Sequence, residues 1–266
     1  MTTPPVTTYH CDRSNRLTEI DEPSGTTVTF AYDANGQRVK KTTQTGGSNP
    51  TMTIVNDTYQ NGRLAYQTNL GGTVLATFTY DPGGVPESVV VGADPTTSPR
   101  YYYVYNGHGD VVALTDASGN VVASYSYDVW GNLTASSENI SNANGWTNPY
   151  RYDGKDGARY DAETGLYWLT TRAYDPTLGR FLQRDPLGRF PLFFWSQPYV
   201  YAGNNPLINV DPSGERFADE DILSQATAQQ QIAETRRTQQ VQSMQRIGPA
   251  WKSRCLRSRR PCGTLL

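Results

Sequence analysis

A tyrosine recurs at nearly even intervals along most of this chain. Six of these tyrosines are followed by aspartate: Tyr32, Tyr80, Tyr127, Tyr152, Tyr160 and Tyr174. When Tyr9, Tyr59 and Tyr105 are added and Tyr160 is left out, successive members of the series lie 21 to 27 residues apart. Repeat proteins have periods of this size, because each unit is one supersecondary element that packs against its neighbours.

The segment around each tyrosine reads as a β-hairpin. Thr26–Tyr32 is rich in Thr, Val and aromatic residues, and the turn residues 33–36 (DANG) separate it from a second β-rich run, Gln37–Thr42. Asn-Gly between two such runs is a strong hairpin signal. Most of these runs alternate polar and apolar residues, which predicts a sheet with one solvated face. Val89–Val91 and Tyr101–Tyr105 do not alternate, so these two runs are predicted to be covered on both faces.

Composition also favours an all-β protein. The chain has 18 Tyr, 24 Gly and 17 Pro residues. Aromatic and β-branched residues suit half-buried strands, and Gly and Pro suit turns. Residues 136–147 (SSENISNANGWT) are predicted to be a loop and a disordered insertion. Residues 218–246 contain no Gly or Pro and are predicted to form a helix of low amphipathicity.

Charge and histidine content narrow the functions open to the chain. Charged residues make up 18% and the net charge is −2, so no general attraction to nucleic acid or membrane is expected. The N-terminus lacks the basic-then-apolar pattern of a signal peptide, which implies another export route or a piece of a longer protein. His10 and His108 are far apart and lack companions at ligand spacing, so neither a metal site nor a cofactor is expected.

The strongest apolar runs lie in residues 149–214, in a block that is also rich in turns. The runs are Leu166–Leu169 and Pro191–Trp195. Asp-Pro turns begin at three positions in the block: Asp175, Asp185 and Asp211. Pro presets φ at the second turn position, and Asp accepts a hydrogen bond from the backbone ahead of it. The block is therefore predicted to close the repeat scaffold.

The repeats and this block together resemble the Rhs, or YD-repeat, proteins. The specific match is ETGLYWLTTRAYDPTLGRFLQRDP at residues 163–186, followed by YVYAGNNPLINVDPSG at residues 199–214. More narrowly, the block is similar to the C-terminal Rhs core-associated domain, which is related to the C subunits of Tc toxins. The resemblance implies an all-β fold in which YD-repeat hairpins form part of a curved or spiralling sheet, a shell fragment, with a C-terminal plug and a helical tail. It places the repeat scaffold at residues 1–147, the core-associated domain at 148–214 and a variable tail, partly helical or disordered, at 215–266.

The resemblance also implies a function. Such proteins are polymorphic toxins that encapsulate a C-terminal effector and release it by intramolecular aspartic autoproteolysis after the second DPxG motif. Carried onto this chain, the catalytic carboxylates are Asp185 and Asp211, with Arg184 as an auxiliary, and the cut falls at Gly214, next to Glu215. The implied partners are the chain's own effector segment, a longer repeat protein or delivery machinery, and an immunity protein. The implied location is secreted or at the bacterial cell surface, and cytoplasmic before export.

Paired carboxylates suit this chemistry on physical grounds. Two carboxyl groups close together share one proton, so one can activate water while the other polarises the scissile carbonyl. The sequence departs from the family pattern in two ways: the motif spacing is longer, with Asp185 and Asp211 as its ends, and Glu215 stands where the family has an apolar Leu. The alternative interpretation is a non-enzymatic surface or wall-associated YD-repeat module, or a truncated Rhs fragment. In that case the two aspartates only cap structural turns.

Overall fold

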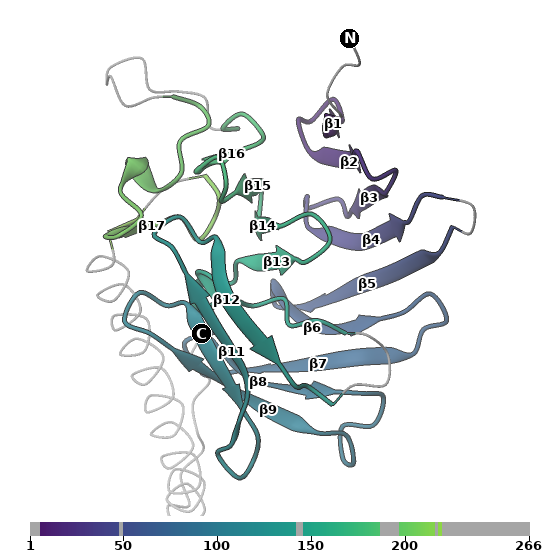
Figure 1. The fold of residues 1–266 in the computed structure, drawn as a ribbon, viewed down its shortest axis with the longest axis vertical. Helices are drawn as coiled ribbons and strands as arrows, with labels where there is room; N and C mark the ends of the chain where they lie inside the picture. Colours follow the sequence, from purple (N-terminus) through teal and green to yellow (C-terminus); the bar gives the residue numbers. More distant parts are fainter. Residues whose placement is uncertain (1–5, 48–49, 142–145, 187–196, 216–217, 220–266) are drawn as a thin grey trace, which may run out of the picture. The chain divides into compact units, whose positions relative to one another are not determined.

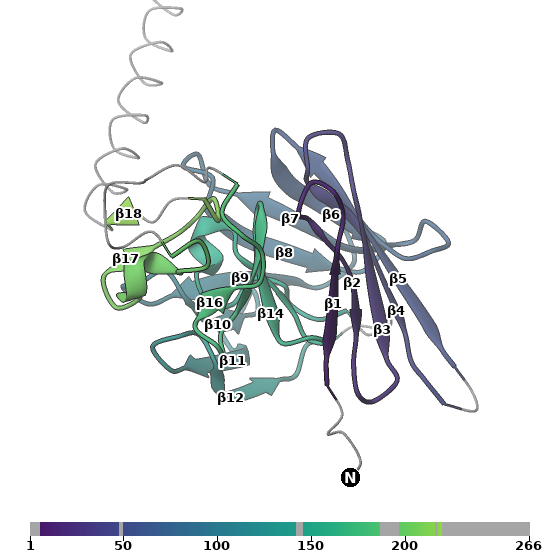
Figure 2. The same cartoon turned by 90° about the horizontal axis from the view of Figure 1, so that it is seen from above.

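The structure is a computed structural model that describes residues 6–47, 50–141, 146–186, 197–215 and 218–219 of the 266-residue chain. Its main element is one sheet of 12 antiparallel strands, in which each strand pairs with its neighbours in sequence. Figures 1 and 2 show this sheet curving round the strands that follow it. Its strands are β1 (Thr8–Cys11), β2 (Leu17–Asp21), β3 (Thr27–Tyr32), β4 (Arg38–Gln44), β5 (Met52–Gln60), β6 (Arg63–Thr68), β7 (Val74–Tyr80), β8 (Pro86–Val91), β9 (Arg100–Tyr105), β10 (Val111–Thr115), β11 (Val121–Tyr127) and β12 (Leu133–Glu138).

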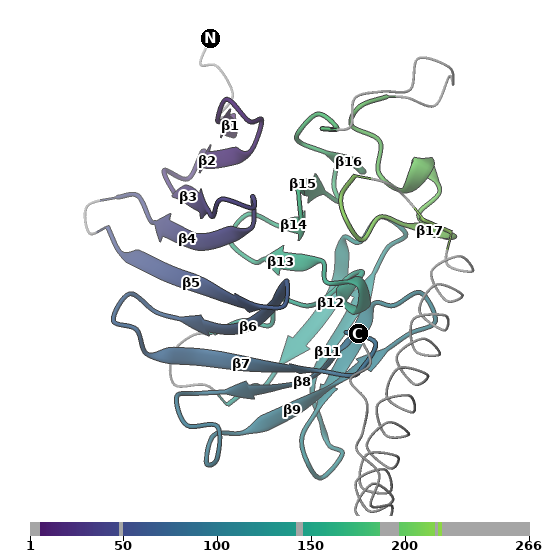
Figure 3. The same ribbon diagram turned by 180° about the vertical axis from the view of Figure 1, so that it is seen from behind.

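The sheet is open, because β1 and β12 stand at opposite ends of the strand order. The view from behind in Figure 3 shows the same course from β1 to β12. The prediction of an all-β fragment of a YD-repeat shell is therefore confirmed. The predicted tail at 215–266 lies outside the described residues, except for Glu215 and the two-residue strand β18 (Ala218–Asp219). In the part of the chain that the structure describes, no helix is long and apolar enough to cross a membrane.

The recurring tyrosines link successive hairpins. Five of them, from Tyr32 to Tyr127, each donate the hydroxyl to a backbone carbonyl that lies 15 to 21 residues earlier in the chain. Tyr59 and Tyr105, which lack the following aspartate, make the same bond as the Tyr-Asp members. The donor–acceptor pairs are Tyr32 with Leu17, Tyr59 with Arg38, Tyr80 with Leu64, Tyr105 with Pro86 and Tyr127 with Val111.

The aspartate after the tyrosine closes the turn. Asp33 Oδ1 accepts hydrogen bonds from the backbone N–H groups of Asn35 and Gln37, both at 2.9 Å. Gly36 has φ 82°, a left-handed conformation that glycine adopts without strain. The β3–β4 register shifts between Ala31 and Tyr32, as expected for a hairpin with a glycine bulge. The side chains of Asp81, Asp116 and Asp128 accept from the backbone of their own turns in the same way.

Burial in the sheet agrees with part of the sequence analysis. Ser88 and Val89–Val91 are all buried, which confirms the prediction for this run. The prediction for Tyr101–Tyr105 is wrong, because this strand alternates and Tyr102 and Val104 are each 39% exposed. The predicted disordered insertion at 136–147 is also wrong in its described parts. Ser136–Glu138 belongs to β12, and the indole of Trp146 is needed to fill the core, where it is 6% exposed.

A small second sheet follows the large one. It contains β13 (Arg159–Asp161), β14 (Leu166–Leu169), β15 (Arg172–Asp175) and β16 (Arg180–Phe181). Every residue of β14 and β15 is buried. We call the described residues from 146 to 215 the core block; it also contains the 3-10 helices η1 (Gly154–Asp156) and η2 (Ala202–Asn204) and the strand β17 (Asn209–Val210), which pairs with β18.

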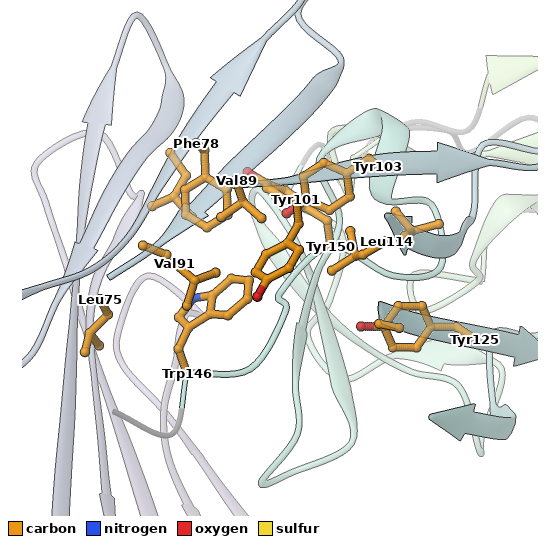
Figure 4. Packing of buried hydrophobic residues seen from close by; sticks show 14 residues of the cluster. Leu75, Phe78, Val89, Val91, Tyr101, Tyr103, Leu114, Tyr125, Trp146 and Tyr150 are labelled. Carbon is orange, nitrogen blue, oxygen red and sulfur yellow. The ribbon is translucent and has the colours of Figure 1, made fainter. Parts of the chain in front are cut away.

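Aromatic side chains join the start of the core block to the large sheet. The rings of Phe78 and Tyr150 meet edge to face with centroids 5.5 Å apart, and Phe78 lies 6.3 Å from Trp146. Figure 4 shows Trp146 and Tyr150 among labelled side chains of β7 to β9. Such pairs contribute about 0.5–1.5 kcal/mol each beyond the burial of apolar area. This cluster is the largest core of the described chain.

A buried network of charges attaches the small sheet to β4 and β5. Asp161 contacts Arg38 and Lys41, and Arg159 Nη1 lies 2.7 Å from Asp57 Oδ2. Buried charges need well-placed partners, because removing them from water costs several kcal/mol per ion. These ion pairs therefore favour a single position of β13 against β4 and β5, because a shifted strand would leave buried charges without partners. Its charges balance, with cations on Arg38, Lys41 and Arg159 and anions on Asp57, Asp161 and Glu163.

Tyrosines of the core block bind the turn between β11 and β12. Their hydroxyls donate to three consecutive carbonyls of that turn. A Cβ on Gly131 would lie 2.7 Å from the ring of Tyr152, so glycine is required at this contact. The pairs are Tyr152 with Val129 at 3.1 Å, Tyr174 with Trp130 at 2.7 Å and Tyr167 with Gly131 at 3.0 Å.

Removing one repeat hydroxyl tests the link between hairpins. Tyr127→Phe is expected to lower the free energy of unfolding by about 1–2 kcal/mol, because the carbonyl of Val111 loses its donor. Urea unfolding followed by tryptophan fluorescence measures the loss. Tyr102→Phe, at a side chain that is 39% exposed, is the control and should leave the free energy nearly unchanged. Equal effects in the two variants would contradict the role given to the repeat tyrosines.

Acid should weaken the charge network at a defined pH. Burial opposes ionisation of Asp161, but Arg38 and Lys41 outweigh it and lower its pKa to about 2. A lowered pKa in the folded state stabilises the protein above the unfolded pKa, near 4, and this stability is lost as the pH falls toward about 2. Asp161→Asn should therefore cost about 3–5 kcal/mol at neutral pH and progressively less below pH about 4. Asp33→Asn is the control at a turn; a pH-independent cost for Asp161→Asn would refute the assignment.

Candidate functional site

The hairpin between β14 and β15 carries the central residues of the candidate site. Leu169 pairs with Arg172, so Thr170 and Thr171 form a two-residue turn. Thr170 has φ 40°, which is unusual for a β-branched residue and marks a tight turn. The turn places Thr171 and Arg172 beside the second Asp-Pro turn of the closing motif. Thr171 Oγ1 donates to the carbonyl of Ser213 at 2.9 Å.

Arg172 lies between the two predicted catalytic aspartates. Its Nη2 is 3.3 Å from Asp185 Oδ2 and 3.5 Å from Asp211 Oδ2. The arginine is 2% exposed, and its guanidinium carbon lies 3.6 Å from the centre of the Phe181 ring. Burial lowers the pKa of Arg172 below its usual value, whereas the charges of Asp185, Asp211 and Glu215 oppose that shift. The structure thus brings Asp185 and Asp211 to one guanidinium group.

The backbone carbonyl of Gly214 meets the same arginine. It accepts a hydrogen bond from Arg172 Nε and lies 3.1 Å from Thr171 Oγ1, whose single proton is shared between this carbonyl and that of Ser213. Gly214 has φ 69°, and a Cβ there would lie 2.3 Å from the carbonyl oxygen of Leu169. Its N–H closes the turn on the carbonyl of Asp211 at 3.2 Å. Both predicted carboxylates and the predicted cleavage position are therefore tied to Arg172.

The two aspartates differ in their access to water. The side chain of Asp185 is 26% exposed, and that of Asp211 is 3% exposed. The backbone N–H of Asp185 donates to the carbonyl of Pro198 at 2.9 Å, and Arg172 Nη1 donates to the same carbonyl at 3.2 Å. Asp185 is thus placed by its backbone at the edge of the site, while Asp211 lies inside it.

Arg184 lies differently from the other predicted residues. It is exposed, and its backbone carbonyl accepts a hydrogen bond from Asn15 Nδ2 at 2.9 Å. The arginine that contacts both aspartates is Arg172, which sequence reasoning missed along with Thr171. Both follow the apolar run of the motif closely. The only signal in the sequence that could have pointed to them is the presence of a charged arginine beside that run.

A cleft of about 170 Å³ opens beside this group. It includes Glu215, the residue on the far side of the predicted cut. The turns after β1 and β3 form its other wall. Its lining residues are Ser14, Asn15, Arg16, Asn35, Gly36, Thr170, Thr171, Arg172, Gln183, Arg184, Pro186 and Glu215. The cleft has room for water next to the Gly214–Glu215 peptide.

The expectation that the histidines lack carboxylate neighbours is wrong at both positions. His10 Nε2 lies 3.0 Å from Asp21 Oδ2, across the β1–β2 pair. His108 Nδ1 lies 3.1 Å from Asp110 Oδ1 and 3.4 Å from Asp153 Oδ1. Pairing of β1 with β2 creates the His10 contact, and packing of the core block brings Asp153 to His108. Asp110 lies only two residues after His108 in the same turn, a neighbour that sequence reasoning overlooked.

An open YD-repeat sheet that encloses a core block with a paired-aspartate site defines a shell protein of the Rhs type. Residues 3–200 match the Teneurin YD-shell family, so this chain belongs to that family. The crystal structure of TcdB2-TccC3-TEV has the same fold, with a TM-score of 0.61 at 20% identity over 78% of this chain and 10% of that chain. The chain is thus a YD-shell domain with the fold seen in that TccC3 complex.

Curated relatives with toxin names are similar over most of this chain. The tRNA3(Ser)-specific nuclease WapA of Bacillus spizizenii is 36% identical over 217 residues, which is 78% of this chain and 8% of the nuclease. Double-stranded DNA deaminase toxin A of Burkholderia cenocepacia is 30% identical over 204 residues, which is 70% of this chain and 14% of that toxin. The chain therefore spans a small part of the length of these relatives and is toxin-related.

Adding one methyl group at Gly214 tests the tight contact at the site. Gly214→Ala and Gly157→Ala both place alanine at positive φ, 69° and 92°, but nothing lies within 4 Å of a Cβ at Gly157. Gly214→Ala should therefore lower the free energy of unfolding by at least about 1 kcal/mol more than Gly157→Ala. Urea unfolding of both variants measures the difference. Equal losses would contradict the close approach of Gly214 to the β14–β15 turn.

Proposed function

We propose that this chain hydrolyses its own peptide bond between Gly214 and Glu215. The observation that carries the proposal is that Arg172 contacts both Asp185 and Asp211 and also donates to the Gly214 carbonyl. A scissile group held within its own chain needs no substrate-binding step, and its proximity to the reacting groups can replace several kcal/mol of entropic cost. The adjoining cleft gives water a place to enter.

The two aspartates divide the proton transfers between them. Asp185, the more exposed carboxylate, takes a proton from water as the water oxygen bonds to the carbonyl carbon of Gly214. Asp211, which is buried, gives a proton to the nitrogen of Glu215 as the C–N bond breaks. The products are a carboxyl group on Gly214 and an amino group on Glu215.

Arg172 and Thr171 stabilise the charge that develops on the carbonyl oxygen. Arg172 Nε donates to the Gly214 carbonyl, and the Thr171 hydroxyl can turn its proton from Ser213 to the same oxygen. A donor that is already oriented toward a developing oxyanion typically accounts for about 10²–10³ in rate. Arg172 also reduces repulsion between the two carboxylates. Its placement between them allows a buried Asp211 to approach Asp185 without both having to be protonated.

The reaction serves the release of an effector in this proposal. Residues 1–147 form the repeat scaffold, 148–214 the core-associated domain, and 215–266 the segment that is released. The relatives support this role because one is named a tRNA nuclease and another a DNA deaminase toxin. A longer repeat protein or delivery machinery would carry the segment, and an immunity protein would protect the producing cell. The site of action is outside the cytoplasm, after secretion or at the cell surface.

A non-enzymatic structural module is the second candidate. It is favoured by the ion pairs themselves, because Arg172 would also serve simply to tie the turns that begin at Asp185 and Asp211 to β15. In that case removing either carboxylate changes only the stability of the chain, and neither the wild type nor the variants are cleaved.

The mass of the purified chain decides between these candidates. At neutral pH the wild-type chain is expected to yield two products, residues 1–214 and 215–266, in intact-mass spectra recorded over several days. Asp185→Asn and Asp211→Asn should abolish the cut, and Arg172→Met should slow it by at least about 100-fold.

Asp175→Asn is the matched control, since Asp175 also starts an Asp-Pro turn and its side chain caps that turn through Thr177. This variant should cut at the wild-type rate. A wild-type chain that remains intact would remove the protease and leave the structural module, and loss of cutting in Asp175→Asn alone would point to general instability.

A further inference from the structure

A histidine and two aspartates meet at the junction between the large sheet and the core block, outside the proposed cleavage site. His108 and Asp110 lie in the turn between β9 and β10, and Asp153 directly precedes η1. Asp110 and Asp153 are 6% and 2% exposed. None of the three contributes to the steps proposed for Asp185 and Asp211.

We propose that His108, Asp110 and Asp153 bind one divalent transition-metal ion. One imidazole nitrogen and two carboxylate oxygens form a donor set that suits ions such as Zn²⁺ and Mn²⁺. The three donor atoms lie within 4.8 Å of one another. The distances from His108 Nδ1 to the carboxylate oxygens are 3.1 and 3.4 Å. Ligands bound tetrahedrally at about 2.0–2.1 Å are separated by about 3.3 Å, so little movement is needed.

Neighbouring groups already orient both carboxylates. Asp110 Oδ2 accepts from Asn106 Nδ2 at 2.8 Å, and Asp110 Oδ1 accepts from the backbone N–H of Asp153 at 3.0 Å. The hydroxyl of Tyr201 donates to Asp153 Oδ2. Outer partners of this kind fix the direction of metal ligands and strengthen binding. Asp153 Oδ1 is the oxygen that remains directed at the imidazole.

The second observation is that Asp153 Oδ1 is buried and accepts no hydrogen bond within the described part of the chain. A single proton on His108 Nδ1 cannot serve both carboxylates, although Nδ1 lies near both. Burying a carboxylate oxygen without a donor or a cation costs several kcal/mol. A divalent cation placed among the three donors would remove that cost.

Protonation is the other way to relieve the same cost. Burial raises the pKa of Asp153 to about 7, the charges of Asp110 and Asp156 add to the rise, and His108 opposes it. The ion would join the sheet, through His108 and Asp110, to the core block, through Asp153.

The chain contains a matched control group. His10, Glu19 and Asp21 have the same donor types within 4.8 Å of one another. That group is exposed, with 49% of the His10 side chain and 43% of the Asp21 side chain accessible. It tests whether surface histidines and carboxylates alone account for metal uptake.

The experiment measures metal content and thermal stability of the full, untagged chain. After treatment with chelator, the protein is dialysed against ZnCl₂ or MnCl₂, and bound metal is counted by mass spectrometry. Wild type and His10→Ala are expected to retain one ion per chain and to melt a few degrees higher with metal than without it. His108→Ala should bind at least about tenfold more weakly and lose the shift in melting temperature.

Asp153→Asn is the second variant and serves as the test if His108→Ala does not fold. Asparagine keeps the shape of the side chain and its contact with Tyr201. It should lose metal to the same extent as His108→Ala. The proposal is overturned if the folded wild type retains neither ion at one per chain. It is also overturned if His10→Ala abolishes uptake, or if folded His108→Ala and Asp153→Asn bind as the wild type does.

Discussion

The hydrogen bond from a tyrosine hydroxyl to the carbonyl of an earlier hairpin is the constraint on which the rest of this structure depends. It recurs from Tyr32 to Tyr127 and sets how each hairpin lies on the one before it. The core block uses the same chemistry, since its tyrosines donate to the carbonyls of Val129, Trp130 and Gly131. One kind of bond therefore builds the sheet and then attaches the core block to its final turn.

Three different kinds of interaction fix the position of the core block on the large sheet. Aromatic packing provides apolar area, the network of Arg38 and Asp161 demands one arrangement of charges, and the tyrosine bonds require specific carbonyls. A shift of the small sheet by one residue would break all three together, which is how buried polar groups specify a register. This rigidity places the β14–β15 turn, and with it Arg172, against the Gly214 carbonyl.

Sequence reasoning predicted the features that repeat and missed those that depend on contact between distant segments. The tyrosine period, the hairpin strands and the turn at residues 33–36 follow from local preferences, the curved sheet follows from the family resemblance, and the structure contains them. The resemblance to a known motif also pointed to Asp185 and Asp211. Arg172 was missed because an arginine beside apolar residues gives no sign of its partners. Trp146 was missed for a related reason: it lies in a polar stretch, and the core on the large sheet buries it.

The central claim is that the groups around Arg172 sever one bond by adding water to it. Cleavage of the full chain in H₂¹⁸O at neutral pH, followed by sequencing of both fragments by mass spectrometry, tests this most directly. The account predicts a single new N-terminus at Glu215 and one ¹⁸O atom in the new carboxyl group of Gly214. New termini at Pro176, Pro186 or Pro212, which ordinary acid cleavage of Asp-Pro bonds produces, or no new terminus at all, would contradict it.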